Sequence, residues 1–209
     1  GHSFMGKDID YLKMGEGSLR LLIWSQMHGN ETTGLRAMRQ LWDKWKEKTP
    51  EEYDLHKYTI YWIPQLNPDG AELWRRCNAQ GIDLNRDVRS GKSEEMRLFK
   101  KLFEQIRPHY ALNLHDQRSL FSAGESENGA ALSWAVPQVD QKLAWNQTLP
   151  AQRLKMQRAA IIASKALQSE WPDSFARFDD SYYPKATGEW AQEQGAATLL
   201  IESGVGDID

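Results

Sequence analysis

Residues Leu19–Gly34, LRLLIWSQMHGNETTG, hold the pattern from which the fold is predicted. An apolar run at 19–24 leads into a polar turn that carries His28 and Glu31. A short apolar run bounded by turn residues is typical of a buried strand in a parallel sheet. His28 and Glu31 then lie just beyond the carboxyl end of that strand, where open α/β sheets place their ligands. The pair can face one metal ion, although it is also compatible with an ordinary polar turn before a helix.

The residues that follow predict a strand, helix, strand unit. Apolar residues recur at three- and four-residue steps over 35–45, which predicts an amphipathic helix over about 33–48. A second strand is predicted at 58–64, parallel to the first because a helix connects them. Upstream, the apolar residues of 9–12 predict either an edge strand paired with strand 19–24 or an ordered leader.

Two later apolar runs also end in a residue that can bind a metal or move a proton. Residues 110–114 precede His115, and residues 197–201 precede Glu202. Because parallel strands bring their carboxyl ends to one edge of a sheet, we expect these side chains to meet the first pair. Two histidines and one glutamate are a known ligand set for catalytic zinc. The remaining glutamate, Glu202, would then be free to act as a base.

The rest of the chain adds helices and one long loop. Helices are predicted at 93–107, 151–171 and 187–194, and residues 121–150 are predicted as loop with a short apolar piece at 130–136. In the helix at 151–171, Leu154 and Ile162 are among the expected buried residues. The expected fold class is α/β: a three-layer, mixed and mostly parallel sheet with helices on both faces, in one domain spanning 1–209.

Composition excludes several classes of partner. A net charge of −3 over 209 residues provides no basic field for nucleic acid. No apolar stretch approaches the roughly 18 residues that span a bilayer, and the first residues lack a basic-then-apolar secretion pattern. The lone Cys77 excludes an internal disulfide framework and fits a reducing compartment, so a cytoplasmic location is expected. The oligomeric state is left open.

An ordered set of motifs runs through the chain. The motifs are His28-x-x-Glu31, Asn67-Pro68-Asp69-Gly70, Arg76-x-Asn78-x-x-Gly81-Ile82-Asp83-Leu84-Asn85-Arg86, Asn113-Leu114-His115, and Glu202 at a strand end. In this order they resemble the zinc metallocarboxypeptidases, the carboxypeptidase A and B superfamily, in the form of a short bacterial-type member. The resemblance covers nearly the whole chain and implies the family's three-layer fold, which is also that of the phosphorylase/hydrolase-like proteins.

The resemblance implies a zinc-dependent hydrolase that cleaves the C-terminal peptide bond. Its substrate would be a peptide, or a peptide-like molecule, with a free C-terminal carboxylate. His28, Glu31 and His115 would bind one Zn²⁺, and Asp83 would accept a hydrogen bond from the far nitrogen of His28. Glu202 would be the general base for a metal-activated water.

The resemblance also implies residues that contact the substrate. Arg76 would stabilise the oxyanion at the scissile carbonyl, and Asn85 and Arg86 would bind the terminal carboxylate, although a salt-bridged loop pair is the alternative for these two. The family's mobile tyrosine would be Tyr182 or Tyr183. We predict Tyr183, because it directly precedes Pro184 in a loop.

Some features depart from the family, and two other functions remain open. The chain ends soon after Glu202, where the family continues into a closing helix, so this domain is expected to be truncated there. Asp116 and Gln117 differ from the residues at these positions in the digestive enzymes, so the preference of those enzymes for particular substrate side chains cannot be assigned to this chain. One alternative is a deacylase of N-acyl amino acids, resembling aspartoacylase and succinylglutamate desuccinylase; the other is an inactive binding module. The Arg76-x-Asn78 spacing favours the peptidase, and the intact Glu202 argues against loss of activity.

Overall fold

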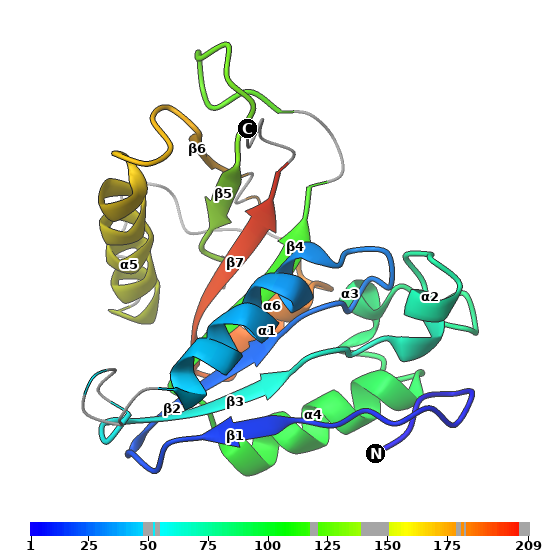
Figure 1. Ribbon diagram of the computed structural model, residues 1–209. Coiled ribbons are helices and arrows are strands. Elements are labelled where there is room, and N and C mark those ends of the chain that lie inside the picture. The colour runs from blue at the N-terminus through cyan, green and yellow to red at the C-terminus, as the bar shows by residue number, and fades with distance from the viewer. Residues whose placement is uncertain are drawn as a thin grey trace.

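The computed structural model describes residues 1–47, 52, 55–117, 121–138, 151–178, 181 and 183–204, which form a mixed sheet with helices on both faces (Figure 1). The strand order is β1-β3-β2-β4-β7-β5-β6. The strands are β1 Leu12–Met14, β2 Leu19–Trp24, β3 Tyr58–Ile63, β4 Tyr110–Asp116, β5 Leu132–Ala135, β6 Phe175–Arg177 and β7 Ala197–Ser203. The helices are α1 Thr33–Lys46, α2 Pro68–Glu72, α3 Leu84–Asp87, α4 Glu94–Ile106, α5 Ala151–Leu167 and α6 Thr187–Glu193.

The centre of the sheet is parallel. Strands β3, β2, β4 and β7 run parallel to one another, while β1 is antiparallel to β3 and β5 is antiparallel to β7. In this register His115 of β4 lies opposite Glu202 of β7. The expected mixed, mostly parallel sheet is therefore confirmed, and the carboxyl ends of β2, β4 and β7 reach the same edge.

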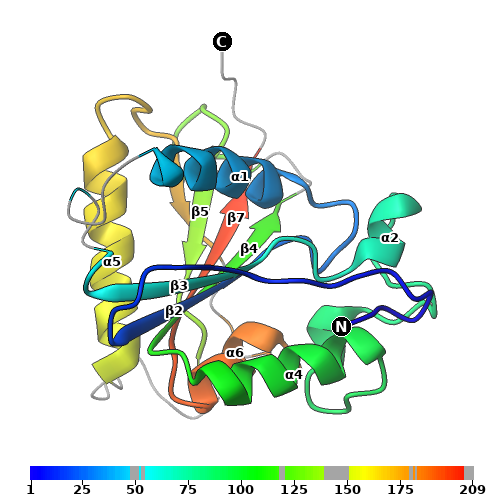
Figure 2. The same ribbon diagram turned by 60° about the horizontal axis from the view of Figure 1, so that its bottom comes forward.

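Helices cover both faces of this sheet. On one face, Trp42 of α1 packs with Trp62 of β3, and Met156 of α5 packs with Leu199 of β7. On the other face α4 and α6 pack against β2, and Figure 2 shows them on the side opposite α1. The apolar residues of each helix thus separate the layers, as burial of one helix face requires. Among the described helices, none combines the length and apolarity needed to cross a bilayer.

The prediction for the N-terminal strand was wrong about its partner. β1 is an edge strand, but Leu12 lies opposite Trp62 of β3 and not beside β2. The reason is that β2 already has parallel neighbours on both sides, β3 and β4, so its backbone hydrogen bonds are fully used. Only the outer edge of β3 is left to pair with β1.

The prediction was also incomplete near the C-terminal half of the sheet. β5 lies inside the segment predicted as loop, and β6 was not predicted as a strand. Helix α5 ends at Leu167 and presents a different face from the expected one: Leu154 and Ile162 are 37% and 68% exposed, whereas Met156 and Ala160 are buried. Apolar residues occur all around this helix, so periodicity could not select the face that packs on β7.

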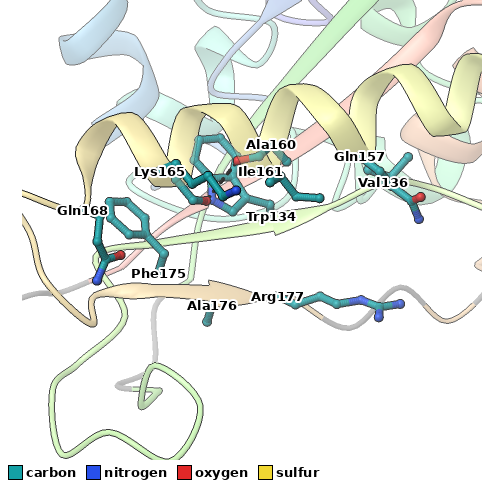
Figure 3. Close-up of a pocket in the computed structure, with 11 residues that line it drawn as sticks. Trp134, Val136, Gln157, Ala160, Ile161, Lys165, Gln168, Phe175, Ala176 and Arg177 are labelled. Atoms are coloured by element: carbon teal, nitrogen blue, oxygen red, sulfur yellow. Dashed lines mark hydrogen bonds between the residues drawn. The ribbon is translucent and has the colours of Figure 1, made fainter.

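A hollow of about 510 Å³ lies between α5 and the pair β5–β6 (Figure 3). Figure 3 shows the Trp134 ring turned from β5 toward α5, where Ala160 and Lys165 lie beside it. Its wall contains none of the residues predicted to bind metal or substrate. The chemistry must therefore be sought elsewhere, at the carboxyl edge of the parallel strands.

Candidate active site

Three predicted ligands converge at that edge. His28 and Glu31 lie in the turn between β2 and α1, His115 lies near the end of β4, and all three are buried. Nδ1 of His28 is 2.7 Å from Oε1 of Glu31, and Nδ1 of His115 is 2.8 Å from Oε2 of the same carboxylate. One ligand atom from each residue lies within 4.8 Å of the others. Both imidazoles thus turn the same nitrogen toward one point.

Surrounding residues contact these predicted ligands. Nε2 of His28 lies 3.1 Å from Oδ1 of Asp83, and Nε of Arg76 donates to Oδ2 of Asp83 at 2.9 Å. The Asp116 backbone N–H donates to Oε2 of Glu31 at 3.3 Å. A carboxylate on the far nitrogen fixes the ring orientation and tautomer of a ligating histidine. The contact between His28 and Asp83 is the one that the family resemblance implied.

Hydrogen bonds within the cluster favour the charged forms of Glu31, Asp83 and His28. Burial opposes charge on Glu31 and Asp83, but the hydrogen bonds from the histidines outweigh it and lower the pKa of both carboxyls. Burial also opposes charge on His28, yet its bonds to Asp83 and Glu31 raise the pKa of the imidazole. Both carboxylates are therefore ionised across the physiological pH range and can attract a cation.

The donor set fits Zn²⁺. Two imidazole nitrogens and one carboxylate oxygen leave room for a fourth ligand, as in catalytic zinc sites. In the described part of the chain, Nδ1 of His28 and Nδ1 of His115 hydrogen-bond only to Glu31, and the far nitrogen of His28 is bonded to Asp83. His28, Glu31 and His115 therefore form a candidate metal site.

Glu202 lies beside this site on the neighbouring strand. Directly opposed residues of adjacent strands share a sheet face, so Glu202 and His115 project to the same side. Burial raises the pKa of Glu202 to about 7. The charges of Glu31 and Asp116 act in the same direction, while His115 and Arg76 oppose them. A carboxyl with this pKa can both accept and return a proton near neutral pH.

The predicted substrate residues lie around α3 and α6. Asp83 caps α3 by accepting from the Asn85 N–H at 2.9 Å, and Oδ1 of Asn85 accepts from the Thr187 N–H at 2.9 Å. The exposed Arg86 places its guanidinium carbon 5.9 Å from the ring centroid of Tyr183, which is 46% exposed. The structure thus brings Arg86 and Tyr183 together. The alternative candidate, Tyr182, lies outside the described residues.

Comparison of the sequence with protein families identifies the group to which it belongs. The sequence model of the family described as zinc carboxypeptidase matches residues 1–196. The chain belongs to the zinc carboxypeptidase family. The matched span contains His28, Glu31 and His115, and it ends before β7 and Glu202.

Individual zinc carboxypeptidases and related proteins are similar over different shares of the chain. Carboxypeptidase 2 of Trichophyton rubrum is 33% identical over 117 residues, which are 52% of this chain and 20% of that protein. The metallo-carboxypeptidase from Burkholderia cenocepacia superposes with a TM-score of 0.73 at 20% identity, over 99% of this chain and 55% of that one. Carboxypeptidase A from Helicoverpa armigera has a TM-score of 0.73 at 17% identity, over 98% and 58%. The chain therefore has the zinc carboxypeptidase fold and spans about half the length of these structures.

One ionisable residue near the site was missed by the sequence analysis. Glu189 of α6 is buried, and its Oε1 accepts from the Tyr183 N–H at 3.3 Å. Burial raises the pKa of Glu189 to about 7, while the charge of Arg86 opposes the shift. An acidic residue in the first turn of a helix is usually exposed and favourable to the helix dipole, so the sequence carries no sign of this burial.

Proposed function

We propose that this member of the zinc carboxypeptidase family removes the C-terminal residue from peptides or peptide-like molecules. The observation that carries the proposal is the convergence of His28, Glu31 and His115 at a sheet edge where Glu202 projects from the next strand. Such a group provides metal ligands and a base for hydrolysis of an amide bond. That residues 1–209 form one domain, and that the protein is cytoplasmic, stay predictions.

The residues around the metal would have different roles. His28, Glu31 and His115 would hold one Zn²⁺, which when bound polarises the scissile carbonyl and lowers the pKa of water. Asp83 keeps the His28 ring turned so that Nδ1 faces the site. The ionised Glu31 balances part of the cation's charge, and its contacts with both imidazoles set the spacing of the ligand atoms.

Glu202 would transfer the proton. The oxygen of the attacking water bonds to the carbonyl carbon while one of its protons passes to the Glu202 carboxylate. When the C–N bond breaks, Glu202 returns that proton to the leaving nitrogen, and the products are a shortened chain and a free amino acid. Its pKa of about 7 suits both halves of this exchange.

Two arginines would recognise the negative charges of the substrate. Nη1 of Arg76 lies 3.5 Å from Oε1 of Glu31, so its positive charge is beside the metal ligands, where the oxyanion develops. Arg86, together with Asn85, would bind the terminal carboxylate, for which a planar guanidinium is suited. Tyr183, next to the Arg86 guanidinium, would close over the substrate.

The proposal is tested with substrates from two classes. Protein purified with Zn²⁺ is given blocked dipeptides and N-acyl amino acids, with and without a chelator, and Glu202→Gln serves as the matched variant. We expect hydrolysis of the dipeptides that chelation abolishes and the variant lacks. Turnover of N-acyl amino acids alone would instead indicate a deacylase. Stoichiometric zinc without any turnover would indicate a binding module.

A further inference from the structure

One buried side chain organises the loop between Arg76 and Asp83. Oδ1 of Asn78 accepts hydrogen bonds from the backbone N–H groups of Gln80 and Ile82, at 3.0 and 2.9 Å. The Asn78 backbone N–H also donates to the Ile82 carbonyl at 3.0 Å. This loop is short and connects Arg76, which contacts Glu31, to Asp83, which contacts His28. Its conformation therefore sets where Arg76 and Asp83 can lie.

The other end of the Asn78 amide is held by helix α4. Nδ2 of Asn78 donates to Oε2 of Glu95 at 3.1 Å, and both residues are 0% exposed. Oε1 of Glu95 accepts from the Phe4 N–H at 3.3 Å, and no ion pair to Glu95 occurs among the described residues. Glu95 lies in the first turn of α4.

This pairing permits only one orientation of the amide. The N–H groups of Gln80 and Ile82 need an acceptor, so the oxygen of Asn78 must face them. Its nitrogen, a donor, then faces Glu95, whose carboxyl oxygen accepts. Rotating the amide would set its oxygen against the carboxylate and leave two backbone donors without an acceptor, which is costly in a buried site.

We propose that Glu95 is a positioning residue for the active site. By fixing the Asn78 amide, it holds the loop so that Asp83 reaches Nε2 of His28 and Arg76 lies between Asp83 and Glu31. Neither Glu95 nor Asn78 touches a metal ligand in the described contacts. Their influence on zinc affinity does not depend on the substrate; their influence on kcat rests on the proposed function.

An exchange of the two residues tests the pairing. Asn78→Asp places two carboxylates face to face. The double variant Asn78→Asp/Glu95→Gln keeps the total charge of the original pair and allows every hydrogen bond. In the bond between the two side chains, residue 95 becomes the donor and residue 78 the acceptor. We expect Asn78→Asp to weaken zinc binding about 10- to 100-fold, as loss of an orienting partner does, and to lower kcat with little change in KM. The double variant should restore both to within about threefold of the original protein.

A destabilised but correctly arranged protein provides the control. Phe103→Leu alters a buried residue of the same helix away from Asn78 and should lower the melting temperature without changing zinc affinity or kcat. Zinc affinity is measured by competition with a chelator, well below each melting temperature. If Asn78→Asp does not fold, Asn78→Ala replaces it and must show the same loss of zinc affinity.

The outcomes separate this inference from the proposed function. Unchanged zinc affinity in a folded Asn78 variant, or a double variant that regains stability but not affinity, would overturn the positioning role. If the original protein hydrolyses no peptide, the proposed function fails, while the zinc affinities of the variants still decide the role of Glu95.

Discussion

Glu189 carries a stability cost that a single substitution should remove. The residue is buried on α6, and its folded pKa of about 7 compares with an ordinary value of 4.5. Glu189→Gln keeps an oxygen that can accept the Tyr183 N–H but cannot ionise. The variant should therefore be more stable than the original protein wherever the original must hold a buried charge.

The magnitude and its sign follow from the two pKa values. Below pH 4.5 the glutamate is neutral in both folded and unfolded chains, so ionisation has no cost. As pH rises from 4.5 to 7 the unfolded chain releases its proton first, and the folded state loses stability progressively. The difference between a pKa of about 7 in the folded chain and one of 4.5 in the unfolded chain corresponds to about 3 kcal/mol. The loss is complete above pH 7 and does not grow further.

Urea unfolding at several pH values measures this loss. Tryptophan fluorescence reports unfolding, since Trp190 beside Glu189 is itself buried, and excess chelator removes any contribution from metal binding. The free energy of unfolding of the variant should be higher than that of the original protein, and this difference should be about 3 kcal/mol larger at pH 8 than below pH 4.5. Glu193→Gln is the matched control: Glu193 lies on the same helix but pairs with Arg89 at 2.6 Å, so its loss should not stabilise the protein, and the charge of Glu193 raises the pKa of Glu189 far less than burial does. A difference between Glu189→Gln and the original protein that stays constant from pH 5 to pH 8 would refute the reasoning.

Four further predictions concern the site and the packing around it. Glu202→Gln should keep zinc bound in equilibrium dialysis and lower kcat about 100-fold or more. In the original protein, kcat/KM should rise with pH as Glu202 ionises. The midpoint of this rise should lie at or below about pH 7, because a bound cation opposes the effect of burial on the pKa of Glu202. Arg86→Ala should raise KM for peptides far more than it alters zinc affinity, and an equal loss of both would contradict a role in carboxylate binding. A Cβ at Gly29 would overlap the backbone of Gly70 and Ala71, so Gly29→Ala should lower the free energy of unfolding by about 3 kcal/mol, and unchanged stability in urea would contradict this packing.

The metal-site candidates and the candidate base could be predicted from the sequence because each is tied to a local signal. His28 with Glu31, His115 and Glu202 all follow or end apolar runs, and a parallel sheet collects such ends at one edge. The order of β2, α1 and β3 could be predicted for the same reason, since strand and helix periodicities are local patterns. The contact between Asp83 and His28 came from the family resemblance and not from any local pattern.

Other features depended on neighbours that are distant in the sequence. β1 pairs with β3 because the edges of β2 are occupied, and α5 buries Met156 because of where β7 lies. The chain's own pattern contains neither fact.

What the sequence by itself determined is where β2, β4 and β7 end and which chemical groups lie at those ends, because strand formation and turn chemistry act over a few residues. The tertiary structure decided which groups are buried and what they face. Glu189 acquires its raised pKa only when neighbouring elements exclude water from it. Glu95 accepts a hydrogen bond from Asn78 only when helix α4 and the loop pack together. Burial and hydrogen-bond partnership are properties of packed neighbours, and those neighbours are chosen by the fold as a whole.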